Sequence, residues 1–153
     1  MNVEEKLKDP TERVEQLLSA DDILSANDVV IEWCPVPEWG GGKGGVYVRS
    51  LMGDELDDYQ GSMLTKNGKG KQVVTYQNMR AKLVAKTACD KEGKRLFNDG
   101  QVPLLAKKNA AGLSRVFEVA SRLSGLNEKD IKEMEDSLKK DLPDGLPSDS
   151  QGT

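Results

Sequence analysis

A glycine-rich segment between two β-favouring runs constrains the fold of this chain more than any other feature. Residues 40–45 are glycine at every position except Lys43, and Pro-Glu-Trp stands directly before them. Residues 29–33 read Val-Val-Ile-Glu-Trp, and residues 46–51 alternate in side-chain type. Such runs on either side of a tight turn predict an antiparallel β-hairpin over residues 29–51, with one face on a core. Trp39, at the edge of the turn, is expected to be its apolar clasp.

Helical patterns account for most of the remaining sequence. Ser19 is expected to cap a short helix gripped by Ile23 and Leu24, since small polar residues favour helix amino termini. Apolar spacings of three and four residues predict a helix from Gly53 with Leu56, Tyr59 and Met63, one over 73–89, one from Pro103 that continues or restarts at Asn109 and ends at Gly125, and one capped by Asn127. The predicted fold is therefore α+β: a small antiparallel β-hairpin packed on a mostly helical bundle.

Composition divides the chain into three parts. Residues 1–18 are highly charged and predict a mobile arm, whereas residues 19–141 are expected to form a single α+β domain. Residues 142–153, rich in proline, glycine and serine, predict a disordered tail. Within the domain, residues 65–71 contain lysine and glycine but no apolar side chain, which indicates an exposed flexible loop.

The residue types present narrow the classes of function. The 153 residues include no histidine, so the commonest general base and metal ligand is missing. We therefore expect neither an enzyme nor a bound cofactor or metal. Cys34 and Cys89 form no metal-binding pair or disulfide framework, which favours buried thiols in a reducing compartment. No apolar stretch approaches the ~20 residues that span a membrane, and the charged amino terminus is unlike a secretory signal. These features predict a cytosolic protein without a membrane partner.

Charge is unevenly spread around the formal net value of −4. Acidic residues are concentrated in residues 1–61, and basic residues in residues 62–115. Such segregation either steers a charged partner or is neutralised within the fold or an oligomer. We favour neutralisation within the fold or an oligomer.

Three motifs suggest ligand sites but fit a plainer interpretation better. Residues 40–45 match G-x-G-x-x-G, yet a strand rather than a helix follows them, which favours a hairpin tip without bound phosphate. The acids of residues 54–58 lack the spacing of a calcium loop and suit a solvated helix start. The lysines of residues 66–71 have no interleaved aromatic to stack on bases, so nucleic-acid binding is not favoured.

An apolar stripe is the strongest candidate for a binding surface. It consists of Leu113, Val116, Phe117, Ala120 and Leu123, on one side of a predicted helix. The stripe is most economically core, but a groove for a partner helix uses the same spacing. The sequence leaves both interpretations open, and as a hypothesis we include these five residues and Trp39 in a partner-binding site.

The order of the motifs resembles the tail assembly chaperones of long-tailed bacteriophages. The resemblance rests on PEWGG at residues 37–41, V-x-V-R-S-L at residues 46–51 and the helix start at residues 53–57. It continues through Arg80–Ala85 and Glu92–Phe97, and then through residues 113–126. In all it covers roughly residues 19–138, most of the chain.

The resemblance implies a non-catalytic function in the host cytoplasm. Proteins of this family bind the tape measure protein, a long helical chain, and keep it soluble while the tail tube polymerises around it. They leave as the tube grows, so the tail tube protein is a second expected partner, and self-association is plausible. Many families also make a longer form by ribosomal frameshifting, for which residues 142–153 are the place to look. The alternatives are a structural tail component retained in the virion and a small nucleic-acid-binding regulator.

Overall fold

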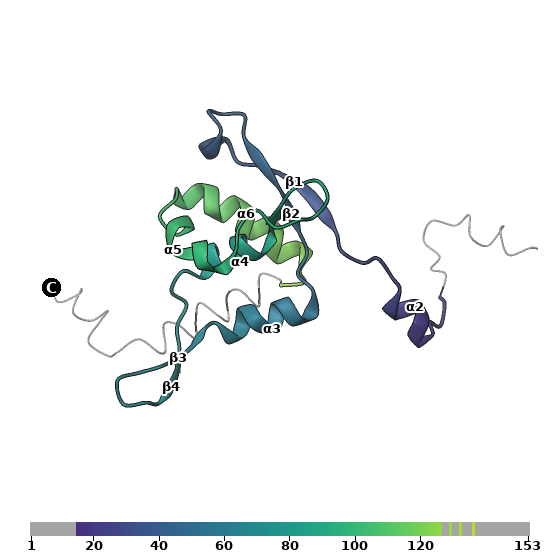
Figure 1. The fold of residues 1–153 in the computed structure, drawn as a ribbon, viewed down its shortest axis with the longest axis horizontal. Helices are drawn as coiled ribbons and strands as arrows, with labels where there is room; N and C mark the ends of the chain where they lie inside the picture. The colour runs from purple at the N-terminus through teal and green to yellow at the C-terminus, as the bar shows by residue number, and fades with distance from the viewer. Residues whose placement is uncertain (1–14, 127–128, 130–131, 133–135, 137–153) are drawn as a thin grey trace, which may run out of the picture.

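The computed structural model describes residues 15–126, 129, 132 and 136. A three-stranded antiparallel sheet, ordered β1-β2-β5, forms one layer of the fold (Figure 1). Its strands are β1 (Ile31–Pro35), β2 (Gly45–Arg49) and β5 (Ala88–Cys89). In the β1–β2 hairpin Trp33 lies opposite Tyr47, and a short 3-10 helix, η1 (Pro37–Trp39), opens the glycine turn. The predicted hairpin is therefore present, and β5 adds a third strand that the sequence analysis did not foresee.

Helices form the second layer, on the face of the sheet that carries Cys34, Val36 and Val48. They are α3 (Gly53–Gly61), α4 (Met79–Thr87), α5 (Val102–Leu105) and α6 (Ala110–Leu123), with the 3-10 helix η2 (Asp99–Gln101) before α5. Helix α6 crosses both hairpin strands, and α4 contacts α3, α5 and α6. The fold is α+β, as the sequence predicts.

The ends of α6 follow from local sequence. The Asn109 side chain accepts a hydrogen bond from the Gly112 amide at 3.0 Å, which satisfies one of the free N–H groups of the first turn. Gly125 adopts a φ of 81°, a left-handed conformation that glycine takes without strain and that ends the helix. The stop at Gly125 was predicted, and the cap decides that the helix restarts at Asn109, which the sequence analysis left open.

A second hairpin replaces part of two predicted elements. Strands β3 (Leu64–Lys66) and β4 (Gln72–Val74) pair antiparallel, so the predicted helix over residues 73–89 begins only at Met79. The β-branched Val73 and Val74 favour extended backbone, and the pairing with β3 overrides their helical spacing. The predicted loop at 65–71 is exposed, but it is the ordered tip of this hairpin. There the Asn67 side chain accepts hydrogen bonds from the backbone amides of Lys69 and Lys71.

The amino-terminal part of the described chain lies apart from these layers. Helix α2 (Ala20–Leu24) has the predicted cap. The Ser19 hydroxyl accepts a hydrogen bond from the Asp22 amide, and the Asp22 carboxylate accepts one from the Ser19 amide. No residue of α2 is buried. An extended segment joins α2 to β1, and the helix lies away from the sheet and the other helices (Figure 1). Ile23 and Leu24 therefore do not grip the domain as expected. Most of the predicted arm, most of the helix after Asn127, and the tail at 142–153 lie outside the described residues.

Candidate partner-binding surfaces

The predicted binding stripe is mostly interior. Leu113, Val116, Phe117 and Ala120 are all at most 6% exposed, packed with the buried side chains of the hairpin and α4. Leu123 is half-buried against the same core. In this folded state the stripe is therefore part of the hydrophobic core. The four buried residues can contact a partner only if the hairpin separates from α6.

Trp39, the sixth predicted site residue, packs on α6. A Cβ atom at Gly112 would come within 2.9 Å of the Trp39 Nε1, so the indole lies directly against the helix where a side chain is missing. Beside it, Glu38 accepts hydrogen bonds from the Arg115 guanidinium at 2.9 and 3.1 Å. These bonds hold the pKa of the Glu38 carboxyl below its ordinary value. The apolar contact predicted for Trp39 is thus made with α6, and it holds the hairpin tip on that helix.

An open groove of about 600 Å³ lies between the hairpin tip and α5. Its apolar lining comprises Trp39, Phe97, Leu104 and Leu105, and Lys108 and Gln101 are among its polar residues. Leu104 is 67% exposed, although Leu105, the next residue of the same short helix, is buried. A concave, largely apolar surface of this size suits a side-chain cluster of another protein segment. We call it the α5 groove.

The outer face of the sheet carries a second apolar surface. Trp33 and Tyr47 meet edge to face, with ring centroids 5.1 Å apart, and the Trp33 side chain also covers Gly45. Trp33 is nevertheless 48% exposed. We call this pair the aromatic face. The sequence analysis missed it, although opposite positions in an antiparallel hairpin point to the same face and so would have placed the two rings together.

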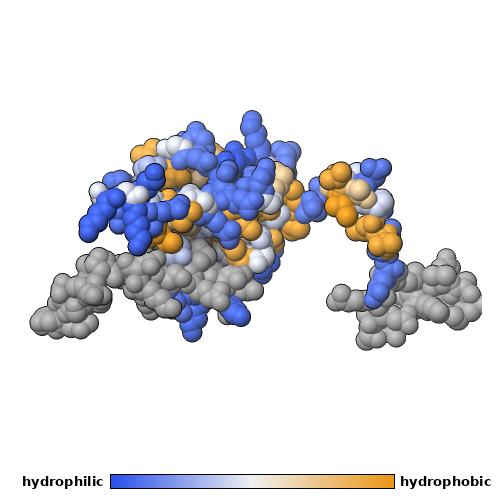
Figure 2. Space-filling model, turned by 90° about the horizontal axis from the view of Figure 1, so that it is seen from below, coloured by the Kyte–Doolittle hydropathy of each residue, from blue (hydrophilic) through white to orange (hydrophobic). Residues whose placement is uncertain are grey.

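Helix α2 and the residues before it form the third apolar surface. Leu17, Leu18, Ile23 and Leu24 are 97%, 51%, 57% and 83% exposed. Figure 2 shows these apolar side chains gathered on α2, apart from the main body of the molecule. Large apolar side chains gathered on one exposed segment are unusual in a soluble monomer and mark an interaction site.

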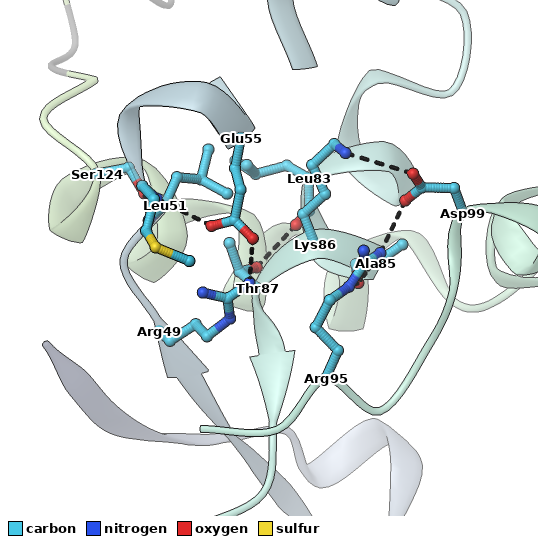
Figure 3. A network of polar contacts seen from close by, with 11 residues as sticks. Arg49, Leu51, Glu55, Leu83, Ala85, Lys86, Thr87, Arg95, Asp99 and Ser124 are labelled. Carbon is cyan, nitrogen blue, oxygen red and sulfur yellow. Dashed lines mark hydrogen bonds and ion pairs between the residues drawn. The ribbon is translucent and has the colours of Figure 1, made fainter. Parts of the chain in front are cut away.

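The buried polar contacts connect elements of the fold (Figure 3). The buried Arg49 guanidinium donates a hydrogen bond to one oxygen of the Glu55 carboxylate. The other oxygen accepts a hydrogen bond from the Met52 amide at the start of α3. Desolvation raises the pKa of the Glu55 carboxyl, but these hydrogen bonds outweigh it and hold that pKa below its ordinary value. The motif residues Arg49 and Glu55 therefore join β2 to α3, which is a structural role.

A second group in Figure 3 stabilises the segment after β5. Arg95 donates two hydrogen bonds to the Ala85 carbonyl, at 2.8 and 3.0 Å, and one to Asp99 at 2.7 Å. Asp99 also accepts from Lys86 at 3.4 Å. The bonds from Arg95 hold the pKa of Asp99 below its ordinary value. These contacts set the position of η2 and α5, and hence one wall of the α5 groove.

The two cysteines and the glycine segment have structural positions in the fold. Burial raises the pKa of the Cys34 and Cys89 thiols, which makes both poor nucleophiles. The glycine segment is a hairpin tip in which Gly41 and Gly42 have positive φ values, and β2 follows it. In the described part of the chain, no cluster of three potential metal-binding side chains occurs.

Charge segregation is partly neutralised inside the fold. Glu32 on β1 pairs with Arg122 of α6, and Glu38 in η1 pairs with Arg115 of the same helix. Acids of the amino-terminal third thereby meet bases from further along the chain. In contrast, Lys107 and Lys108 beside the α5 groove pair with no acid among the described residues.

No protein-family model, curated protein or solved structure matches this chain. Among residues 15–126, no helix has the length and apolarity needed to cross a bilayer.

Proposed function

We propose that this protein is a non-catalytic tail assembly chaperone that binds the tape measure protein of a bacteriophage tail and keeps it soluble in the host cytoplasm. The specific partner comes from the resemblance of the motif series at residues 37–57. The tail tube protein would displace the chaperone as the tube grows. The structure supports the proposal by offering exposed apolar surfaces on a chain whose own core is already closed.

The aromatic face is the observation that carries the binding part of the proposal. Trp33 is held in one orientation by Tyr47 and by its contact with Gly45, yet half of its surface faces solvent. Tryptophan and tyrosine dominate the energetics of protein interfaces because they bury much area and lose little conformational entropy. A pre-positioned Trp33 is therefore suited to pack against apolar side chains of a helical partner.

The motif residues hold the hairpin on the helices rather than form the proposed contact. Trp39 of PEWGG packs on α6 at Gly112, and Arg49 of V-x-V-R-S-L pairs with Glu55 of the following helix start. Each of the three motifs thus contributes one residue to the packing of the hairpin on the helices. We propose that the tape measure protein instead meets Trp33 and Tyr47, on the face of the sheet opposite the one that packs on α6.

Co-expression with the tape measure protein of the same bacteriophage tests the proposal. We expect the chain to keep that protein soluble and to co-purify with it, and Trp33→Ala to abolish both effects. Leu64→Ala is the matched control, because Leu64 is 47% exposed but lies on the separate β3–β4 hairpin. Circular dichroism of both variants establishes that each is folded.

Two results would overturn the proposal. One is failure of the wild-type chain to increase the solubility of the tape-measure-like protein. The other is the presence of the chain in purified mature virions, which would instead identify a structural tail component.

A further inference from the structure

The three-stranded sheet has one open edge, and that edge lies beside the aromatic face. In the order β1-β2-β5, β2 is central, and β1 and β5 are the edge strands. The edge at β5 is occupied by the segment that follows it, because the Leu96 amide donates a hydrogen bond to the Ala88 carbonyl at 3.0 Å and Arg95 bridges Cys89. Within the described part of the chain, no segment pairs with the outer side of β1.

The register of the hairpin shows which backbone groups of β1 face this open side. Just beyond one end of the paired strands the Ser50 amide donates to the Val30 carbonyl, and just beyond the other end the Val36 amide donates to the Gly44 carbonyl, both at 2.8 Å. In an antiparallel pair, hydrogen-bonded positions alternate with non-bonded ones. The even-numbered residues of β1 therefore bond to β2, and the odd-numbered residues direct their N–H and C=O groups away from it.

The outward-facing residues of β1 are Ile31, Trp33 and Pro35. Among the described residues, none of these three makes a backbone hydrogen bond on the open side. Proline fits its outward position, since it lacks an N–H and would remove a bond to β2 at an even-numbered position. Proteins commonly protect an edge strand with proline, lysine or a bulge. Here only the last residue of β1 is protected in this way, so residues 31–34 can accept an added strand.

The side chains around this edge specify the strand that fits it. An added strand lies about 4.8 Å from its neighbour, and its side chains alternate between the two faces of the sheet. On the outer face they would lie beside Trp33, which is 48% exposed, and beside the exposed Pro35. On the other face they would lie beside the ion pair of Glu32 and Arg122, whose side chains are 40% and 59% exposed. The matching segment is therefore extended and alternates apolar with polar residues.

We propose that β1 receives an extended segment of the tape measure protein as a fourth strand of this sheet. The inference rests on the proposed function and adds how the partner is held: the segment is extended where it meets β1, although the tape measure protein as a whole is helical. Main-chain hydrogen bonds at Ile31 and Trp33 supply affinity, and the indole packs on the apolar side chains of the segment. An extended apolar segment that is paired in this way is no longer free to aggregate with another strand.

Amide hydrogen exchange in the complex with the tape measure protein tests the proposal. Exchange is quenched and read residue by residue by mass spectrometry, for the free chain and for the complex purified after co-expression. The amides of Ile31 and Trp33 should exchange at least about tenfold more slowly in the complex, because each gains a hydrogen-bond acceptor. The Lys66 amide is the matched control and should be unchanged, since it also faces away from its partner strand but lies on the separate β3–β4 hairpin.

A proline substitution tests the same pairing by mutation. Ile31→Pro removes an outward-facing N–H and leaves the hydrogen bonds between β1 and β2 in place, as Pro35 does. Ile31→Ala also loses the isoleucine side chain but keeps the N–H, so it is the matched control. At equal expression, Ile31→Pro should co-purify about tenfold less tape measure protein than Ile31→Ala, which corresponds to the loss of one or two hydrogen bonds. Circular dichroism establishes that both variants are folded.

The outcomes separate this inference from the proposed function. Failure of the wild-type chain to form a complex overturns both. A complex in which the amides of Ile31 and Trp33 exchange as fast as in the free chain overturns the added strand and leaves the chaperone function intact. A folded Ile31→Pro variant that binds as well as Ile31→Ala has the same consequence. If Ile31→Pro does not fold, the exchange rates of the wild-type chain decide the matter alone.

Discussion

Gly112→Ala is expected to destabilise the protein, although the same change in an exposed helix stabilises it. Alanine is favoured over glycine inside a helix by about 0.8–1 kcal/mol. At Gly112, however, the new Cβ atom would lie 2.9 Å from Trp39 Nε1 and 3.0 Å from its Cε2. The indole must move off the helix, and overpacking of this kind costs about 1–3 kcal/mol. The difference leaves a net destabilisation of about 1 kcal/mol.

Urea unfolding followed by circular dichroism measures this change, and Trp39→Ala provides the matched background. Without the indole, the Cβ atom meets no obstacle from residue 39, so Gly112→Ala should become stabilising by about 0.8 kcal/mol. The double-mutant cycle should therefore return a coupling of about 2 kcal/mol between the two positions. Such a reversal of sign is specific to a direct contact between Trp39 and the helix.

Equal stabilisation by Gly112→Ala in both backgrounds would refute this prediction. That result would mean that the indole does not rest on α6. In that case one wall of the α5 groove would be different from the one described.

Three further predictions concern the interior. Phe117→Ala should destabilise the fold by about 3–5 kcal/mol in urea unfolding, because the side chain is only 6% exposed; a value below 1 kcal/mol would contradict its place in the core. Glu55→Gln should cost about 2 kcal/mol at neutral pH by weakening the charged bonds to Arg49 and Met52. The folded pKa of Glu55 is lower than its unfolded pKa, so the stability that it supplies is present above the unfolded pKa and is lost as the pH falls through the lowered folded pKa. The variant should lack this part of the acid dependence, and an unchanged profile would count against the pairing. Cys34 and Cys89 should react with a thiol reagent only in denaturant, since burial raises the pKa of both; rapid labelling of the folded chain would refute their burial.

Local signals predicted the first hairpin and several helix ends. The Ser19 cap and the stop at Gly125 depend on residues within a few positions of each other, and both were predicted from sequence alone. The same kind of signal indicated a restart or a continuation at Asn109, where the structure has a cap. The hairpin turn was equally readable, because five glycines follow Pro-Glu-Trp. Features of this kind are encoded where they occur.

Longer-range pairings could not be predicted in the same way. Strand β5 directly follows helix α4, and it is a strand because Ala88 and Cys89 pair with Val48 and Tyr47. Similarly, Val73 has both β propensity and helical spacing, and only its pairing with β3 decides between them. The second hairpin had a local signal in the Asn-Gly turn at residues 67–68, which the lysine-rich composition obscured.

The candidate site shows the same division between pattern and packing. An apolar stripe has one spacing whether it faces the core or a partner, so Leu113 and Phe117 could not be assigned from sequence. The hairpin covers them, whereas no described element covers Leu24 or Trp33 to the same extent. Binding surfaces are therefore the apolar side chains that remain exposed after the fold has closed, and spacing alone does not identify them.

The aromatic face and the α5 groove can be separated by mutation because they lie on different sides of the molecule. Trp33 is on the outer face of the sheet, and Leu104 borders the α5 groove on the side of the helices. If the aromatic face alone binds the tape measure protein, Trp33→Ala should abolish solubilisation, and Leu104→Glu should leave it unchanged. Loss of solubilisation in a folded Leu104→Glu variant would show that the partner also contacts the groove, because the aromatic face is preserved in that variant.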